Sequence, residues 1–332
     1  MIPVLLPTPE NIRRAADALR QGNLVAMPTE TVYGLAGDAL NPQALAKIFS
    51  VKQRPFFDPL IVHIADRSWV EKLCDQLPPE AKILMDHFWP GPLTLVLPKQ
   101  KLVPDLATSG LNTVAIRMPS HPVAQALLRE ANIPLAAPSA NPFGRLSPTQ
   151  ADHVAADFST GIDCILDGGP CVVGVESTVI GWINGEPTLL RAGGVPLEIL
   201  EVTLKKPVAI HSHDSESSPQ SPGNLPSHYA PRTKLVLIPP NPPEGGAPPW
   251  GVRGEREGLI CFGNEPVLAG FAVVENLSTK GDFHEAATNL FAALHRLDAS
   301  GLNVIYARLL PEIGLGRAMN DRLRKAAAIP PL

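Results

Sequence analysis

PTETVYGLAGDALNPQALAKIFSVKQRPFFDPLIVH, residues 28–63, is the stretch around which the rest of the chain is organised. It opens with a hydroxyl-rich turn, PTETVYG. A helix is expected to follow, because Asn41 is a preferred N-cap and Pro42 is favoured at the first helical position. The helix should end by Arg54, since the proline after Arg54 disfavours helical backbone there. A strand carrying one histidine, His63, is expected next.

Two cations stand at the expected end of this helix, Lys52 and Arg54. An ammonium and a guanidinium two positions apart beside an irregular loop can converge on one anion, and phosphate suits both groups. The alternative is that both side chains complement the helix dipole and are solvated. The apolar neighbours Phe56, Phe57 and Leu60 favour a binding site over a solvated end.

Two further cations end apolar runs, Arg117 in TVAIR and Arg191 in TLLR. A charge at the end of a buried strand must be paired or must bind an anion, although surface charge is the simpler alternative. Neutral hydrogen-bonding groups occur in nearby loops and at strand ends: Thr31, Ser139, Asn141, Ser147, Ser177 and Thr178. Ser139 and Asn141 could also be turn formers beside prolines, and His63 could be a core histidine.

Several kinds of active site have no support in the sequence. The phosphate-loop pattern GxxxxGK[ST], the nucleophile pattern GxSxG and the zinc pattern HExxH are all absent. Cations and hydroxyls without a protein nucleophile suit nucleotidyl transfer, in which a substrate attacks the α-phosphate and pyrophosphate leaves. Mg²⁺ would then be expected as a cofactor, held largely by ATP and water.

Composition limits the possible classes. The net charge is −4, with 28 Lys+Arg against 32 Asp+Glu, so there is no general basic field and no stable nucleic-acid binding is expected. The four cysteines show no CxxC spacing, which fits a reducing cytoplasm. The first residues lack a signal-peptide pattern, and no apolar run is long enough for a membrane span.

Strands and helices alternate through the first 206 residues, which indicates an α/β domain with a mixed, twisted sheet. Residues 207–233 are rich in Ser, Pro and His and are expected to form a linker that folds back as a lid. Residues 234–332 are expected to form a smaller α/β, Rossmann-like domain with a partly parallel sheet. Helices are expected from Thr8 and at 68–76, 79–88, 121–131, 149–158, 283–299 and 317–328; strands are expected at 24–27, 59–64, 93–97, 113–118, 133–137, 164–166, 174–180, 188–191, 235–239, 258–262, 271–277 and 304–309.

A series of motifs occurs in a recognisable order: PTETVYGL, KxRP with DPLIVH, WPGPLTLVL, AIRMPSHP, APSANPFGRLSPT, VESTVI and LLRAGG. This series resembles the YrdC-like domain of threonylcarbamoyl-AMP synthases across residues 10–200. The later SHYAP motif and the second domain resemble the long, two-domain form of that family. The resemblance implies synthesis of threonylcarbamoyl-AMP and pyrophosphate from L-threonine, bicarbonate and ATP. Downstream tRNA threonylcarbamoyl-transferase proteins would then use the product to modify an adenosine beside the anticodon.

The resemblance also implies roles for individual residues. Lys52 and Arg54 would be catalytic and would contact ATP. The threonine side would comprise Thr31, His63, Arg117, Ser139 and Ser177, with Arg117 on the amino-acid carboxylate. The ATP side would add Asp58, Asn141, Ser147, Arg191 and the linker residue Tyr229. At Asp58 family members often carry asparagine, so this carboxylate is expected to meet ATP, Mg²⁺ or Lys52.

Two alternatives remain open from the residues. The same domain could adenylate another carbamoyl substrate, but acylphosphatase, zinc-finger or kinase-like modules that usually accompany such domains are not recognisable in the sequence. The chain could instead be an RNA-binding module with a local basic groove. Its 3 Tyr and 4 Trp and its lack of RNP-type motifs give that alternative little support.

Overall fold

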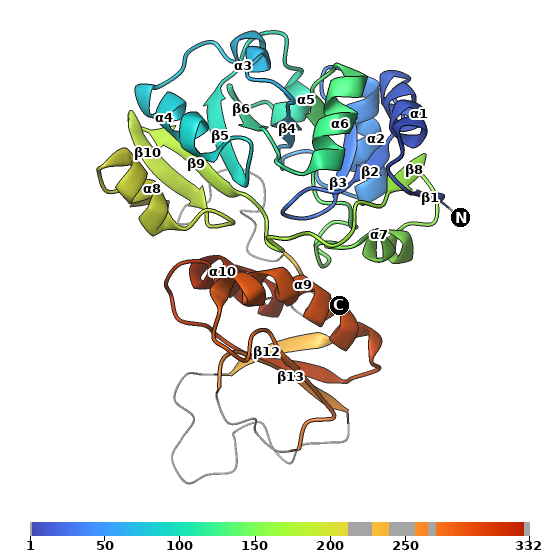
Figure 1. Cartoon of the computed structure of the whole chain (residues 1–332), viewed down its shortest axis with the longest axis vertical. Coiled ribbons are helices and arrows are strands. Elements are labelled where there is room, and N and C mark those ends of the chain that lie inside the picture. The colour runs from blue at the N-terminus through green and yellow to red at the C-terminus, as the bar shows by residue number, and fades with distance from the viewer. Residues whose placement is uncertain (1, 212–227, 239–255, 265–269, 329–332) are drawn as a thin grey trace. The chain divides into compact units, whose positions relative to one another are not determined.

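The computed structural model describes residues 2–211, 228–238, 256–264 and 270–328. These residues divide into two compact units, shown in Figure 1. The first unit comprises Met1–Phe143 and Ser147–Leu225, and the second comprises Gly144–Leu146 and Pro226–Leu332. Residues 212–227, which make up most of the expected linker and lid at 207–233 and include Ser227 of SHYAP, lie outside the described residues, as do residues 239–255.

The first unit is built on one mixed sheet of eleven strands, which confirms the expected fold class. In spatial order these strands are β1 (Val4–Leu5), β8 (Cys164–Leu166), β2 (Val25–Met27), β3 (Gly34–Asp38), β7 (Leu135–Ala136), β4 (Ile61–His63), β6 (Thr113–Arg117), β5 (Leu93–Pro98), β9 (Thr178–Ile183), β10 (Glu186–Arg191) and β11 (Ala209–Ile210). Both edge strands, β1 and β11, are two residues long. The strand β11 falls inside the segment expected to be an extended linker.

The helices of this unit pack their apolar sides against the sheet, and Figure 1 shows α1 and α6 side by side near the N-terminus. They are α1 (Pro9–Arg20), α2 (Pro42–Lys52), α3 (Ser68–Leu73), α4 (Pro79–Phe88), α5 (Asp105–Thr108), α6 (Pro122–Ala131), α7 (Ala151–Asp157) and α8 (Leu197–Leu204). The short elements β1, α5, α8 and β11 were not expected from the sequence.

Helix α2 forms as its caps predict. The Asn41 side chain accepts hydrogen bonds from the N–H groups of Gln43 and Ala44, at 2.9 and 3.4 Å. The helix ends at Lys52, and the next residue, Gln53, adopts a left-handed backbone with φ 53°. The cap at the start and the left-handed residue at the end fix where Lys52 emerges from the helix.

Strand β3 was not expected, because GLAGD contains two glycines and no β-branched residue. It forms by antiparallel pairing with β2, in which Ala36 lies opposite Val25. A Cβ atom on Gly37 would lie 2.9 Å from a methyl of Leu24 and 3.1 Å from a methyl of Ile48. Close packing of the strand under helix α2 therefore requires glycine, and this packing outweighs the weak strand propensity.

Two sequence expectations at element ends are wrong. Thr149 was expected to cap a helix, but α7 has Gln150 as its N-cap without a side-chain hydrogen bond. The N–H of Thr149 instead donates to Nδ1 of His153, at 3.2 Å. The strand expected at 174–180 begins only at Thr178, because the preceding residues form a loop whose polar side chains hydrogen-bond elsewhere.

The second unit has a four-stranded sheet in the order β12 (Lys234–Ile238), β15 (Val304–Arg308), β13 (Glu257–Cys261), β14 (Val273–Asn276). All three strand pairs are parallel over the described residues, so the sheet is more parallel than expected. Helices α9 (Phe283–Ala299) and α10 (Gly316–Ala327) pack on it, both visible in Figure 1. This arrangement confirms a smaller α/β domain after the first.

Candidate active site

The PTETVYG turn between β2 and β3 is held by its own hydroxyl groups. Thr29 Oγ1 accepts hydrogen bonds from the N–H groups of Thr31 and Val32, both at 3.2 Å, and donates to the Val32 carbonyl at 2.6 Å. The two threonine hydroxyls lie 2.8 Å apart. Side-chain bonds of this kind stabilise a tight turn without glycine. The turn therefore presents Thr31 in one fixed orientation.

Arg117 lies at the end of β6 and contacts this turn. Its Nη1 donates to Thr31 Oγ1 at 2.8 Å, and its Nε donates to the carbonyl of Gly91 at 3.2 Å. Its Nη2 lies 2.8 Å from Oε1 of Glu30, and both side chains of this ion pair are 4% exposed. The charge that ends this strand was expected to be paired or to bind an anion, and within the protein it is paired. The partner within the protein is a carboxylate.

Glu30 is a site residue that the sequence reasoning missed. Burial raises the pKa of this carboxyl, but the charge and hydrogen bond of Arg117 outweigh burial, so its pKa is below the ordinary value. Glu30 is therefore a carboxylate at neutral pH. The sequence held a signal for Glu30, because this residue lies three positions after the buried strand β2, and a charge buried there needs a partner of opposite sign.

His63 ends β4 and lies directly opposite Arg117 in the parallel β4–β6 pair. Its ring is buried, and Nδ1 lies 3.2 Å from the carbonyl of Ile61. Burial and the charge of Arg117 lower the pKa of His63 to about 3. The imidazole is therefore neutral at physiological pH and can exchange hydrogen bonds with a hydroxyl without adding charge.

The pKa of His63 predicts a loss of stability in mild acid. Between about pH 3 and 6.5 the unfolded chain binds a proton at this histidine and the folded chain does not. Stability is therefore lost as the pH falls below 6.5, by about 2 kcal/mol at pH 5. Urea unfolding at pH 7 and pH 5 should show a smaller difference in His63→Asn than in wild type. The control His87→Asn, at an exposed position on α4, should keep the wild-type difference. The same change in the free energy of unfolding between pH 7 and pH 5 in all three proteins would contradict the prediction.

Ser177 and Arg191 form a second cluster beside β9. The Arg191 guanidinium donates to the Ser177 carbonyl from Nε and Nη2, at 3.2 and 2.9 Å, and to Ser177 Oγ at 3.1 Å. Ser177 Oγ also lies 2.8 Å from Thr94 Oγ1. Thr94 in turn pairs with Arg117 across the β5–β6 ladder. The sheet therefore brings Arg191, Ser177 and Arg117 into one continuous region of the same unit.

Lys52 lies at the end of α2 beside the PSANP loop. Its ammonium donates to the carbonyls of Ser139, at 2.5 Å, and Asn141. The loop is joined to the PTETVYG turn, since Ser139 forms a backbone bridge with Gly34. Burial, together with the nearby charge of Arg54, holds the pKa of Lys52 well below its ordinary value. The structure thus brings Lys52 together with Ser139 and Asn141.

Arg54 forms a buried ion pair with Asp58, with Nη2 and Oδ2 2.8 Å apart. The guanidinium also donates to the carbonyls of Asp58 and Pro59, at 3.0 and 2.8 Å. The side chains are 5% and 0% exposed. Asp58 was expected to meet ATP, Mg²⁺ or Lys52; in this structure its carboxylate meets Arg54.

Ser147 and Thr178 have different surroundings. Ser147 Oγ donates to Oε1 of Glu176 at 2.5 Å, which connects the end of the APSANPFGRLSPT motif with VESTVI. Thr178 Oγ1 donates to the carbonyl of Val195 and accepts from its N–H, at 2.7 and 2.9 Å. These two bonds tie β9 to the chain after β10. Thr178 is therefore a structural residue, while Ser147 joins two motifs of the candidate site.

Tyr229 belongs to the second unit, and its backbone has the left-handed φ of 65°. Its ring packs against Phe291 and His228, with ring centres 5.8 and 4.1 Å away. The guanidinium of Arg322 lies 5.2 Å from the ring centre. An uncommon backbone conformation is sustained here by aromatic and cation–π contacts. The contact of Tyr229 with ATP stays a prediction.

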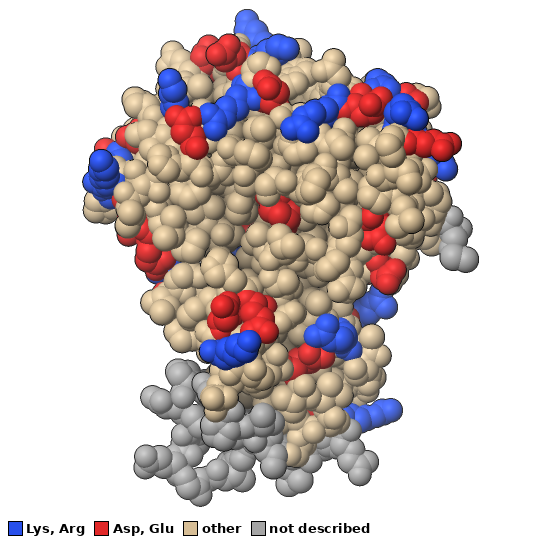
Figure 2. Space-filling view, viewed as in Figure 1, with Lys and Arg blue, Asp and Glu red and all other residues tan. Residues whose placement is uncertain are grey.

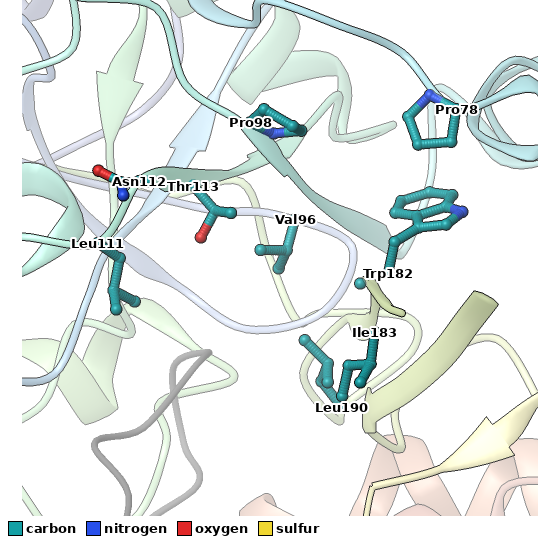
Figure 3. Close-up of a pocket in the computed structure, with 10 residues that line it drawn as sticks. Pro78, Val96, Pro98, Leu111, Asn112, Thr113, Trp182, Ile183 and Leu190 are labelled. Atoms are coloured by element: carbon teal, nitrogen blue, oxygen red, sulfur yellow. The ribbon is translucent and has the colours of Figure 1, made fainter. Parts of the chain in front are cut away.

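A shallow hollow of about 320 Å³ lies on the sheet of the first unit (Figure 3). Val96 and Thr113 line it, and they share a face of the sheet with Thr94 and Arg117 by strand register. Its remaining lining residues are Pro78, Pro98, Leu111, Asn112, Gly181, Trp182, Ile183 and Leu190. The hollow is mainly apolar, and the predicted site residues do not line it.

The described part of the chain offers neither a basic surface on the face viewed nor a cluster of metal ligands. In Figure 2 lysines and arginines lie interspersed with aspartates and glutamates around a broad uncharged area. Among the described residues, no group of three or more His, Cys, Asp or Glu side chains could hold a metal ion. Within the same residues, no helix is long and apolar enough to cross a membrane.

Comparison with known proteins covers nearly the whole chain. A family described as "Telomere recombination" matches residues 17–193, and one described as "Threonylcarbamoyl-AMP synthase, C-terminal domain" matches residues 195–328. A threonylcarbamoyl-AMP synthase of Pyrococcus abyssi is 45% identical, over 95% of this chain and 94% of the relative. One of Bacillus subtilis is 42% identical, over 95% of this chain and 92% of the relative.

Solved structures agree with this comparison. The crystal structure of P. abyssi Sua5 complexed with L-threonine has a TM-score of 0.86 and 42% identity, and the match covers 96% of this chain and 94% of that one. The crystal structure of Escherichia coli YciO, at a TM-score of 0.50 and 25% identity, matches 57% of this chain and 92% of its own. The match to the two-domain relatives over nearly their full length shows that this chain belongs to the threonylcarbamoyl-AMP synthase family.

Proposed function

We propose that this protein makes threonylcarbamoyl-AMP from L-threonine, bicarbonate and ATP, with release of pyrophosphate. The observation that carries the proposal is that two buried cationic side chains lie against two chain segments that are joined to each other. Arg117 lies against the PTETVYG turn, and Lys52 lies against the PSANP loop. The backbone bridge between Gly34 and Ser139 joins these two segments. An amino acid held through its carboxylate and a triphosphate can therefore be bound in neighbouring positions, which a reaction between these two substrates requires.

The first step joins threonine and bicarbonate. The threonine amine, after losing one proton to solvent, attacks the bicarbonate carbon, and water leaves to give a carbamate. Arg117 would hold the threonine carboxylate, and Thr31, Ser139 and Ser177 would supply neutral hydrogen bonds. His63, neutral because burial and Arg117 lower its pKa to about 3, would exchange a hydrogen bond with the threonine hydroxyl. No protein nucleophile is used.

The second step transfers the adenylyl group. A carbamate oxygen attacks the α-phosphorus, the bond from that phosphorus to the bridging oxygen breaks, and pyrophosphate leaves. Lys52 and Arg54 would neutralise charge that develops on the phosphate oxygens. Asn141, Ser147 and Arg191 would complete the ATP side. Asp58 would act on ATP through Arg54, whose guanidinium it orients by the 2.8 Å ion pair.

Mg²⁺ would accompany ATP and would supply charge neutralisation on the triphosphate. The donor set fits this arrangement, because the described residues lack a carboxylate cluster that could hold the ion without nucleotide. The proposal therefore places the ion on phosphate oxygens and water. It classes the protein as a nucleotidyltransferase that works in the cytoplasm. Its product would pass to proteins that transfer the threonylcarbamoyl group to tRNA.

The test is pyrophosphate release from ATP in the presence of bicarbonate, with and without L-threonine. Release that depends on threonine, and a product that hydrolyses to AMP, threonine and bicarbonate, would support the proposal. Release with another carbamoyl donor but not with threonine would support the alternative adenylation reaction. No release under any condition, together with a salt-dependent RNA shift, would support the RNA-binding alternative and overturn the proposal.

A further inference from the structure

The ion pair of Glu30 and Arg117 is enclosed by the first unit. The two side chains come from the turn after β2 and from the end of β6, which are far apart in sequence. Their charged atoms are 2.8 Å apart, and each side chain is 4% exposed. A buried pair of this kind costs desolvation energy that a well-packed hydrophobic pair would not, so stability alone is a weak explanation for it.

Arg117 keeps hydrogen-bonding capacity beyond its protein contacts. Within the described chain, Nε donates to Gly91, Nη1 donates to Thr31, and Nη2 faces Glu30. An arginine carries five N–H groups, so Nη1 and Nη2 retain N–H groups for a ligand. A carboxylate can bind there in the forked geometry that guanidinium favours. The protein contacts thus fix the guanidinium and leave part of it for an anion.

Glu30 changes which anion this site accepts. The charge of Arg117 is already balanced by Glu30, so a ligand that is only an anion meets a neutral pair and a nearby repelling carboxylate. A zwitterion brings a carboxylate for Arg117 and an ammonium group for Glu30. In an α-amino acid these two groups are attached to one carbon, so they can reach two charges that lie in contact.

We infer that Glu30 is a specificity residue that takes the α-ammonium group of the amino-acid substrate, while Arg117 takes its carboxylate. The inference rests on the proposed function and assigns the substrate class of that site. It also separates Glu30 from a residue that merely orients Arg117. An orienting residue would affect every carboxylate ligand equally, whereas an ammonium-binding residue affects only ligands that carry the amine.

The experiment compares two ligands by calorimetry in the absence of ATP and bicarbonate. The ligands are L-threonine and the 2,3-dihydroxybutanoate of matching configuration, in which a hydroxyl replaces the amine. Wild type should bind L-threonine roughly 30-fold more tightly or better, the lower range for loss of one partner from a buried charge pair. Glu30→Gln should reduce this ratio to about one, by weakening threonine and not the hydroxy acid. Equal weakening of both ligands would overturn the inference.

Two further proteins keep the test decisive. Glu30→Asp preserves the charge and should retain most of the wild-type preference for threonine. Glu71→Gln, at an exposed position on α3, should leave the preference unchanged. If Glu30→Gln does not fold, the wild type still tests the inference, because equal affinity of the wild type for the two ligands overturns it. Threonine-dependent pyrophosphate release with no preference for the amine would sink this inference and leave the proposed function standing.

Discussion

Replacing Arg117 with alanine should lower kcat/KM for L-threonine in threonine-dependent pyrophosphate release by about a thousandfold, the range expected when a buried charge-assisted contact is lost. The substitution removes the proposed carboxylate contact. It also removes the groups that hold Thr31 Oγ1 and face Glu30. Steady-state pyrophosphate release at varied threonine measures the effect. The matched control is Arg129→Ala, at an exposed position on α6, which should behave like wild type.

The same substitution should also destabilise the fold, which must be separated from its effect on the reaction. Alanine at this position leaves the Glu30 carboxylate buried without its partner, at a cost of about 3–5 kcal/mol. The double variant Arg117→Ala, Glu30→Gln removes both charges and should recover most of that stability in urea unfolding. It should remain as inactive as the single variant. An active, threonine-dependent Arg117→Ala enzyme with an unchanged KM would show that the carboxylate binds elsewhere.

Replacing Lys52 with alanine should lower kcat by a hundredfold or more, roughly the loss seen when one donor to a developing oxyanion is removed. Lys52 is buried and donates to the carbonyls of Ser139 and Asn141. Its replacement therefore removes a charge and also removes the hydrogen bonds that hold the PSANP loop. The measurement is pyrophosphate release at saturating threonine with varied ATP. Lys47→Ala is the control, since Lys47 lies on the exposed side of the same helix and donates to Gly22.

The lowered pKa of Lys52 adds a second readout of ATP binding. Burial, with Arg54 nearby, favours the neutral amine, whereas a bound triphosphate would favour the ammonium. ATP binding should therefore take up protons at alkaline pH, by up to about one per site. Calorimetry in buffers of different ionisation enthalpy measures this uptake, and Lys52→Ala should reduce it. Wild-type turnover and ATP KM in Lys52→Ala would contradict the role assigned to this residue.

Local sequence signals predicted those elements whose ends are set by neighbouring residues. The Asn41 cap and the following proline set the start of α2, and the helix at 283–299 was predicted with its observed bounds. The strand β3 could not be predicted from local signals. Gly37 is favoured there because Leu24 and Ile48, which lie outside this strand, leave no room for a side chain. Thr149 is of a residue type that often caps helices, but here its backbone N–H donates to the side chain of His153.

The candidate site shows the same division between local and distant effects. The sequence indicated that Arg117 needs a partner but not which one, since Glu30 is eighty-seven positions earlier and meets it only through the sheet. Asp58 is four residues from Arg54, and that pairing follows from local geometry after the helix ends. Thr94 was not singled out, although its hydroxyl contacts that of Ser177, because the adjacency of β5 and β9 is a property of the topology.

The short strands at the two edges of the large sheet bear on how copies of this protein behave together. β1 and β11 each offer only two residues of backbone at an edge of an eleven-stranded sheet. A long, flat edge would give a second molecule a row of unpaired N–H and C=O groups on which to add strands. Two residues supply too few such groups for stable pairing. Over the described residues, the two outermost strands of the large sheet therefore give a second molecule little backbone on which to add a strand.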